Sequence, residues 1–335
     1  MSSFDDFMAN LSPAVRKNTH TVAEVERFRF PTPVVGLNWA LGGGFLAGGV
    51  STVFGGSGSS KSTLMLMCIA LWQSQGYTCG VVDSEGTITN EHAQRLGVDI
   101  TKLVYCDFKG IRQATDTMTT WLRAGIDIII VDTISDLLPA VFEDKDGNVK
   151  EFDDTKQVGA SAKSIRSMIM ALHYSMKPNQ LVILVSQTTT EIGTTYTKQI
   201  PHGGKKIEFN SSQMVQLTSS RAVNQQLKSK IDGAPIGREI TATVLKNKGG
   251  AEFRTISYNL YYGDGLFGID RAADLVAIGI KQSVVFKSGA WLDWNGERHQ
   301  GKDQMAAWLR ENPENMDILE KDIMKALDGV DNNAE

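Results

Sequence analysis

The chain has 335 residues, of which 41% are hydrophobic and 21% charged, with a formal net charge of −4 at pH 7. These values are typical of a globular protein with room for one large domain and a small one, and they exclude a uniformly basic chain, so any nucleic-acid surface must be local. The chain contains no apolar run long enough to span a membrane, and its start lacks the basic region of a signal peptide. Its three cysteines form no metal-ligand spacing, which favours reduced thiols. We therefore expect a cytoplasmic protein.

The N-terminal residues 2–12 have the spacing of a short amphipathic helix, with Phe4, Phe7 and Leu11 on its apolar side. A helix of this length is marginal in water unless it packs on something. Two interpretations stay open at this point: a frayed terminus, or an arm that docks on a neighbouring subunit.

The stretch from Ser51 to Thr63 is the most informative part of the chain. β-Branched and aromatic residues lead into a Gly/Ser turn, the turn ends at Lys61 and Ser62, and an apolar helical run follows. A phosphate-binding P-loop has this strand–loop–helix context, with the lysine on the β- and γ-phosphates and the hydroxyl on Mg²⁺. The residues expected to hold the nucleotide are Gly55, Gly56, Ser57, Gly58, Ser59, Ser60, Lys61, Ser62 and Thr63.

Ser60 departs from the P-loop pattern, which has glycine at this position. If the position needs a positive φ, serine costs about 1 kcal/mol relative to glycine. Taken alone, the stretch is also compatible with an ordinary Gly/Ser loop between a strand and a helix.

From Pro33 onward, predicted strands alternate with predicted helices. The strands are expected at 78–82, 103–106, 127–132 and 180–186, and the helices at 61–75, 90–96, 111–124 and 157–174. This alternation predicts a doubly wound α/β domain with a mostly parallel sheet and ligands at the carboxyl ends of its strands. Segments 214–219, 239–245 and 253–259 read as antiparallel strands that extend the sheet.

Polar residues follow three of the predicted parallel strands. Asp132 follows an apolar β-branched run, as a Walker B aspartate does, and would hold Mg²⁺ through water beside Ser62. Asp83 and Glu85 end another strand, where a carboxylate can polarise the attacking water, and Gln187 ends a third, where it could sense the γ-phosphate. Each residue alone has an ordinary surface explanation, but three such strand ends downstream of a P-loop favour a site.

Two long polar loops interrupt the core, at 142–156 and 188–206. The second carries Tyr196 among basic residues that include Lys198, Lys205 and Lys206. Basic residues beside an aromatic ring suit contact with a nucleic-acid backbone and a base, although a flexible surface loop without a binding role would have a similar composition.

The order of these elements resembles the RecA family of recombinases from about Val22 to Leu327. Asp83-Ser84-Glu85 resembles the strand end that carries the family's catalytic glutamate, and Val185-Ser186-Gln187 resembles the glutamine that opens its second DNA-binding loop. Leu245-Lys246-Asn247-Lys248 resembles the family's lysine pair, and Gly289-Ala290-Trp291 resembles part of its C-terminal domain. Phage-encoded members of the family also depart from glycine at the position of Ser60, so a phage origin is plausible.

The resemblance implies residue roles. Glu85 would be the general base, Gln187 would couple the γ-phosphate to the second DNA loop, and Lys246 and Lys248 would act in trans on a neighbour's ATP. His92 would lie against adenine. The DNA-binding residues implied are Lys163, Arg166, Tyr196, Lys198, Gly203, Gly204, Lys205 and Lys206.

The resemblance also implies an organisation and an activity. We expect an N-terminal arm at 1–33, an ATPase core at 34–270, a small α/β C-terminal domain at 271–328 and a disordered tail at 329–335. With ATP and Mg²⁺, the protein would form helical filaments on single-stranded DNA, pair it with homologous duplex and exchange strands, aided by single-strand-binding and loading proteins. The alternatives are a ring-forming ATPase or helicase of the same core class, and a DNA-coating scaffold whose P-loop is impaired by Ser60.

Overall fold

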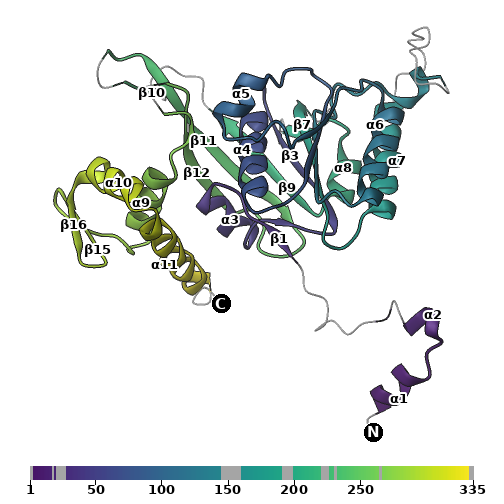
Figure 1. The fold of residues 1–335 in the computed structure, drawn as a ribbon, viewed down its shortest axis with the longest axis horizontal. Helices are drawn as coiled ribbons and strands as arrows, with labels where there is room; N and C mark the ends of the chain where they lie inside the picture. The colour runs from purple at the N-terminus through teal and green to yellow at the C-terminus, as the bar shows by residue number, and fades with distance from the viewer. Residues whose placement is uncertain are drawn as a thin grey trace.

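The structure, a computed structural model, describes residues 3–16, 19, 28–144, 160–190, 199–219, 226–229, 232–263 and 266–331. Within these ranges the chain forms a core around one large sheet, an N-terminal segment with two short helices, and a C-terminal unit with a small sheet of its own (Figure 1). Among the described helices, none combines the length and apolar character needed to cross a membrane.

The central sheet has 11 strands, and the main path through it runs β13-β12-β11-β9-β3-β7-β6-β4-β5. Its parallel strands are β3 (Gly49–Gly55), β4 (Cys79–Asp83), β5 (Val104–Cys106), β6 (Ile128–Asp132), β7 (Leu181–Thr190) and β9 (Gln213–Ser219). The antiparallel extension consists of β10 (Gln226–Lys228), β11 (Pro235–Asn247), β12 (Thr255–Tyr261) and β13 (Gly268–Ile269). The predicted mixed α/β fold is confirmed.

Helices cover both faces of the parallel strands (Figure 1). On β6, Ile128 and Ile130 pack into the cluster that contains α4, whereas Ile129 and Val131 pack into the cluster that contains α6 and α7. A strand buried on both faces needs apolar residues at every position, which is why this stretch is a continuous apolar run.

The helices of the core are α3 (Val35–Leu41), α4 (Lys61–Ser74), α5 (Asn90–Arg95), α6 (Ile111–Ala124), α7 (Ala160–Ser175) and α8 (Lys205–Asn210), with a 3-10 turn, η2, at Ala140–Phe142.

The prediction of a loop at 188–206 is wrong at both of its ends. Strand β7 continues past Gln187 to Thr190 and pairs antiparallel with β8 (Gln199–Pro201), and α8 begins at Lys205. The hairpin is held by ladder pairs such as Thr188 with Pro201, and the chain between its strands lies outside the described residues.

The N-terminal segment contains α1 (Ser3–Ala9) and α2 (Pro13–Arg16), which lie apart from the core in Figure 1. The predicted helix is therefore present, and Phe4 and Phe7 on α1 are 51% and 57% exposed. A short hairpin of β1 (Arg29–Phe30) and β2 (Phe45–Leu46) follows at the entry to the core.

The C-terminal unit contains α9 (Arg271–Lys281), the antiparallel strands β14 (Phe286–Ser288), β15 (Trp291–Trp294) and β16 (Glu297–Gln300), and helices α10 (Gly301–Glu311) and α11 (Pro313–Asp331). Its apolar cluster includes Leu275, Leu309 and Leu319, and it is continuous with Val35 of α3 in the core. Helix α11 runs to Asp331, so the first residues of the expected tail, 329–331, are helical.

Candidate nucleotide site and nucleic-acid interface

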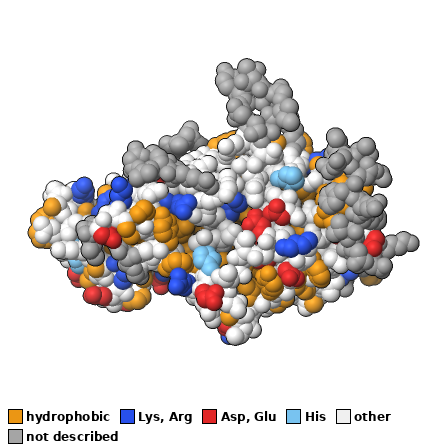
Figure 2. Space-filling view, turned by 90° about the horizontal axis from the view of Figure 1, so that it is seen from above, with side chains coloured by type: hydrophobic (Ala, Val, Ile, Leu, Met, Phe, Trp, Pro, Cys, Tyr) orange, Lys and Arg blue, Asp and Glu red, His pale blue; other side chains and the backbone are white. Residues whose placement is uncertain are grey.

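The loop between β3 and α4 lies at the carboxyl edge of the parallel strands. Seen from the top of Figure 1, this face carries acidic, basic and histidine side chains close to one another near its centre (Figure 2). Ser60, the residue before α4, has φ 64° and ψ 30°. The position does require the left-handed conformation, so its serine carries a strain of about 1 kcal/mol that glycine would avoid.

The Lys61 side chain is buried in the mouth of this loop. Its ammonium donates hydrogen bonds to the carbonyl oxygens of Gly55 and Gly56, at 3.0 and 3.1 Å. Burial lowers the pKa of Lys61, while the charges of Asp132 and Glu85 act in the opposite direction. The hydroxyl of Ser59 is buried nearby and has no hydrogen-bond partner among the described residues. A cation and an unpaired hydroxyl in a glycine-lined loop suit an anionic ligand such as a phosphate chain.

Ser62 and Asp132 meet beneath the loop. The Ser62 hydroxyl forms a hydrogen bond with the Asp132 carboxylate, whose pKa is raised to about 6 by burial, against the effect of that bond. Oδ1 of Asp132 is buried and has no partner in the described part of the chain. The peptide bond between Asp132 and Thr133 is cis.

These two oxygen ligands fit Mg²⁺. The ion prefers oxygen, and it usually takes one or two protein oxygens and completes its shell with water and phosphate. The described residues contain no group of three or more His, Cys, Asp or Glu side chains that could hold a metal ion by themselves.

Asp83 and Glu85 have different surroundings, although both follow β4. Asp83 is fully buried and accepts hydrogen bonds from the backbone N–H groups of Gly86 (2.7 Å) and Ile88 (3.1 Å) and from the Tyr105 hydroxyl (3.2 Å). It therefore fixes the turn that carries Glu85, and its oxygens are not free to polarise water.

Glu85 faces solvent and contacts Gln187 from β7. The Gln187 side-chain amide donates to Oε1 of Glu85 over 3.3 Å. Partial desolvation raises the pKa of Glu85, the bond from Gln187 opposes this shift, and the charge of Asp136 adds to it. The carboxylate is thus poised to take up a proton more readily than an ordinary surface glutamate.

Gln187 is also tied by its backbone to the β7–β8 hairpin. Its carbonyl oxygen accepts a hydrogen bond of 3.0 Å from the N–H of His202, and the His202 ring nitrogen Nε2 lies 3.0 Å from the Ser161 hydroxyl on α7. Gln187 therefore joins the Glu85 turn to the hairpin, and His202 continues the connection to the first turn of α7.

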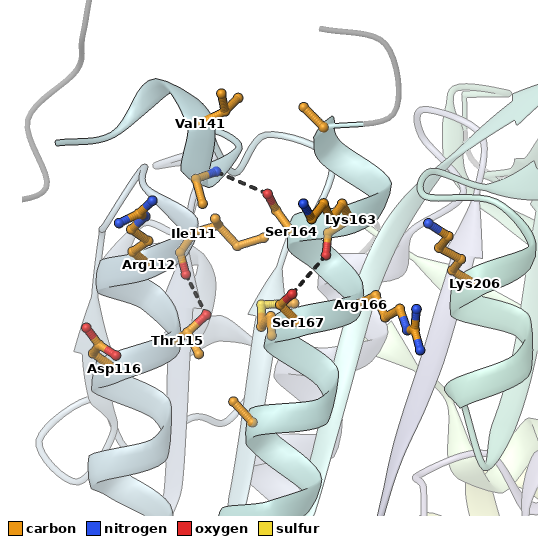
Figure 3. Close-up of a pocket in the computed structure, with 14 residues that line it drawn as sticks. Ile111, Arg112, Thr115, Asp116, Val141, Lys163, Ser164, Arg166, Ser167 and Lys206 are labelled. Carbon is orange, nitrogen blue, oxygen red and sulfur yellow. Dashed lines mark hydrogen bonds between the residues drawn. The ribbon is translucent and has the colours of Figure 1, made fainter. Parts of the chain in front are cut away.

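Basic residues and Asp116 line a groove of about 1190 Å³ whose walls come mainly from α6 and α7. Lys163 and Arg166 project from α7, Lys206 from α8 and Arg112 from the first turn of α6 (Figure 3). In the close-up, Arg166 and Lys206 lie on facing sides of the gap between α7 and α8. The structure thus brings together three of the expected DNA-binding residues and adds Arg112, which the sequence interpretation missed.

The remaining expected DNA-binding residues are only partly described. Gly203 and Gly204 lie directly before α8 with φ of 96° and 64°, and their left-handed backbone favours glycine. Tyr196 and Lys198 lie outside the described residues, as does the side chain of Lys205.

Lys246 and Lys248 lie at the end of β11 and directly after it, and the hydrogen bonds of each lysine lead away from the P-loop. The N–H of Lys248 donates to Ser212, whose own N–H donates to Val50 at the start of β3. Val50 is five residues before Gly55, which corresponds to about 17 Å along a strand. Lys246 instead donates hydrogen bonds to the carbonyl oxygens of Glu208 and Phe209 near the end of α8. Among the hydrogen bonds of the described residues, neither lysine side chain contacts the P-loop of its own chain.

His92, the expected adenine contact, lies on α5 with its ring edge-on to Phe267 at 5.8 Å between centroids. The structure does not bring it into contact with the residues of the P-loop by any hydrogen bond or ring contact in the described part of the chain.

Two further residues contact the P-loop and were missed by sequence reasoning. Arg238 of β11 and Ser219 of β9 both donate to the carbonyl oxygen of Gly58, at 2.8 and 3.2 Å. The only signal in the sequence is that Ser219 ends one predicted strand and Arg238 directly precedes another. This signal does not reveal which edge of the sheet the two side chains reach.

Two family models match the chain. The model of the RecA N-terminal domain matches residues 14–267, and the model of the RecA C-terminal domain matches residues 273–328. The first is a nucleotide-binding ATPase fold, and together the two models span the core and the C-terminal unit described above. The chain therefore belongs to the RecA family of recombinases.

Proposed function

We propose that this protein is a DNA-dependent ATPase that assembles into helical filaments on single-stranded DNA and catalyses homologous pairing and strand exchange. The observation that carries the proposal is the position of Gln187. Its side chain contacts Glu85 at the nucleotide site, and its carbonyl oxygen accepts the N–H of His202, whose ring contacts Ser161 on α7, the helix that carries Lys163 and Arg166 of the basic groove. A single residue thereby connects the chemistry of ATP to a nucleic-acid surface.

The nucleotide site assigns roles to its residues. Lys61 would leave the carbonyl oxygens of Gly55 and Gly56 to bind the β- and γ-phosphates, and Ser62 and Asp132 would hold Mg²⁺. When bound, the metal ion neutralises charge on the phosphate oxygens. Glu85 would accept the proton of the attacking water, and its raised pKa suits that task.

The positions of Lys246 and Lys248 support action in trans, because the Lys246 ammonium is bound to carbonyl oxygens of α8 and not to its own P-loop. A lysine that does not contact the P-loop of its own chain can still reach the nucleotide of a second copy in a head-to-tail assembly, and such an interface builds an open helix unless it closes into a ring. ATP turnover would then require assembly, as it does when an arginine finger is supplied by a partner.

The basic groove supports binding of the phosphate backbone of DNA. Lys163, Arg166 and Lys206 offer three cations on one side of the core, and Arg112 adds a fourth that is 4.0 Å from the carboxylate of Glu143, although the net charge of the whole chain is −4. Binding through phosphates makes affinity fall steeply with salt and leaves sequence recognition to base pairing.

A second candidate function is favoured by one observation, the serine at the left-handed position 60. If its strain prevents the P-loop from holding ATP for hydrolysis, the protein would coat DNA without turnover.

The deciding experiment measures ATP hydrolysis with and without single-stranded DNA for the wild type and for Glu85→Gln, together with DNA binding of both. We expect DNA to stimulate hydrolysis by the wild type, and Glu85→Gln to bind DNA with ATP but hydrolyse none. Nucleotide-dependent DNA binding without turnover by the wild type would favour the coating function, and rings instead of filaments in electron micrographs would favour a helicase-like assembly.

A further inference from the structure

The carbonyl oxygen of Gly58, at the tip of the P-loop, accepts two hydrogen bonds from neighbouring strands of the sheet, one from β11 of the antiparallel extension and one from β9. One comes from Nη1 of Arg238 at 2.8 Å and the other from the Ser219 hydroxyl at 3.2 Å. The first is charge-assisted and has the length of a strong N–H···O bond. Two strands that follow the P-loop by more than 150 residues thus hold one of its carbonyl groups.

The Arg238 side chain is itself held in place. Its guanidinium lies 5.5 Å from the centroid of the Tyr262 ring, within the range of a cation–π contact. The Tyr262 backbone N–H donates to Ile236 at 2.8 Å, and its hydroxyl donates to Gly237 at 3.4 Å, so the ring is tied to β11 beside the arginine. The donor therefore approaches Gly58 from an ordered framework.

The P-loop has a specific need for such a contact. Gly58 and Ser60 both have left-handed φ values, 76° and 64°, and only the first is a glycine. Between them, Ser59 donates its N–H to Gly56 at 3.1 Å and closes a turn. The Gly58 carbonyl and the Ser59 N–H belong to one trans peptide group, in which the C=O and the N–H point in opposite directions. A hydrogen bond that fixes the carbonyl toward β9 and β11 therefore also fixes the N–H on the opposite side, where it bonds to Gly56.

We infer that Arg238 is a positioning residue which, together with Ser219, holds the P-loop in its phosphate-binding conformation and offsets the strain of serine at position 60. The inference rests on the proposed ATP site. It explains how this chain uses a serine where the P-loop pattern has a glycine: the contact that stabilises the loop comes from outside the loop.

The test is a double-mutant cycle read by equilibrium binding of a fluorescent ATP analogue with Mg²⁺ to the full chain. Arg238→Met removes the donors and keeps an unbranched apolar stem, and we expect about tenfold weaker binding. In a Ser60→Gly background the same substitution is expected to cost about threefold or less, because glycine holds the conformation unaided. Arg238→Lys, which keeps a cationic donor, should recover part of the lost affinity.

Arg254→Met is the matched control. Arg254 also stacks on an aromatic ring, that of Trp39 at 4.3 Å, and also donates to a carbonyl, that of Trp39 at 3.0 Å, and neither of these two contacts involves the P-loop. We expect it to leave nucleotide affinity unchanged, even if it lowers the melting temperature.

If Arg238→Met does not fold, Ser219→Ala serves in its place. We expect Ser219→Ala to weaken nucleotide binding about twofold in the wild-type background and to have no effect in the Ser60→Gly background.

Equal affinity of Arg238→Met and the wild type would overturn the inference. So would an equal loss in both backgrounds, since it would mean that Arg238 touches the nucleotide itself and does not act through the loop. A wild type that binds no ATP analogue would instead contradict the proposed function, so the two failures can be told apart.

Discussion

The side-chain amide of Gln187 donates a 3.3 Å hydrogen bond to Oε1 of Glu85 across 102 residues of sequence. This bond holds the pKa of Glu85 down, while desolvation and the charge of Asp136 push it up. The residue that we propose to sense the γ-phosphate therefore also sets the proton affinity of the residue that we propose as the base.

The first prediction concerns Gln187→Met, which removes this bond while keeping a side chain of similar length. The pKa of Glu85 should rise further, and because a general base acts only when deprotonated, the acid limb of ATP hydrolysis should move to higher pH. The measurement is kcat against pH with single-stranded DNA present. Gln304→Met in the C-terminal unit is the control, and an unmoved acid limb in Gln187→Met would count against Glu85 as the base.

The second prediction concerns the stability of the free protein. Burial raises the pKa of Asp132 to about 6, so the native carboxyl keeps its proton at pH values where the unfolded chain, with a pKa near 4, has lost it. Ionised Asp132 therefore costs stability, by an amount that grows from about pH 4 to about pH 6 and is constant above. Asp132→Asn should stabilise the protein at pH 8 without Mg²⁺, by up to about 3 kcal/mol, and by less at pH 5.

Thermal melting at the two pH values measures this effect, and Asp83→Asn is the matched control. Asp83 is equally buried but accepts three hydrogen bonds, two of them from backbone N–H groups, so its replacement should lower the melting temperature. A lower melting temperature for Asp132→Asn at pH 8 would contradict the prediction.

The third prediction tests action in trans. Lys61→Met should lack nucleotide binding but keep its own Lys246 and Lys248, whereas Lys248→Ala should keep its P-loop and lack one trans lysine. Each variant alone is expected to be inactive. In an equal mixture about a quarter of the interfaces of a head-to-tail assembly combine an intact P-loop with an intact Lys248, so about a quarter of the wild-type ATP hydrolysis should return. No recovery on mixing would show that Lys248 does not act across an interface.

The fourth prediction concerns Arg112, which sequence reasoning missed. If it contacts a DNA phosphate from the first turn of α6, Arg112→Ala should weaken binding to all sequences alike and reduce the salt slope by about 1. Arg123→Ala, in the last turn of the same helix, is the control and should leave both unchanged. Fluorescence anisotropy of labelled single-stranded DNA over a range of salt concentrations gives both quantities.

The strand ends of the core could be predicted from the sequence because local patterns define them. A continuous apolar run followed by Asp132 indicates a buried strand and its carboxyl end, and the parallel arrangement then brings Asp132, Glu85 and Gln187 to one edge. The left-handed conformation of Ser60 was likewise foreseeable, because the P-loop pattern has a glycine there.

The contacts between distant segments could not be predicted in the same way. Nothing local to Arg238 indicates that it reaches Gly58, 180 residues away, because that depends on the register of β11 against β9 and of β9 against β3. The β7–β8 hairpin was read as loop because β8 has only three residues, too few for an alternating pattern to emerge.

The hydrogen bonds of Lys246 to Glu208 and Phe209 have a consequence for how the proposed filament would start. In the single chain this ammonium satisfies carbonyl oxygens near the end of α8, where a helix otherwise leaves them to solvent. A copy that turns Lys246 toward a neighbour's nucleotide must first release them. The first two copies lose these hydrogen bonds when only one interface has formed. Nucleation on DNA should therefore be slow, with a lag and a steep dependence on protein concentration. Growth from an existing end should be fast.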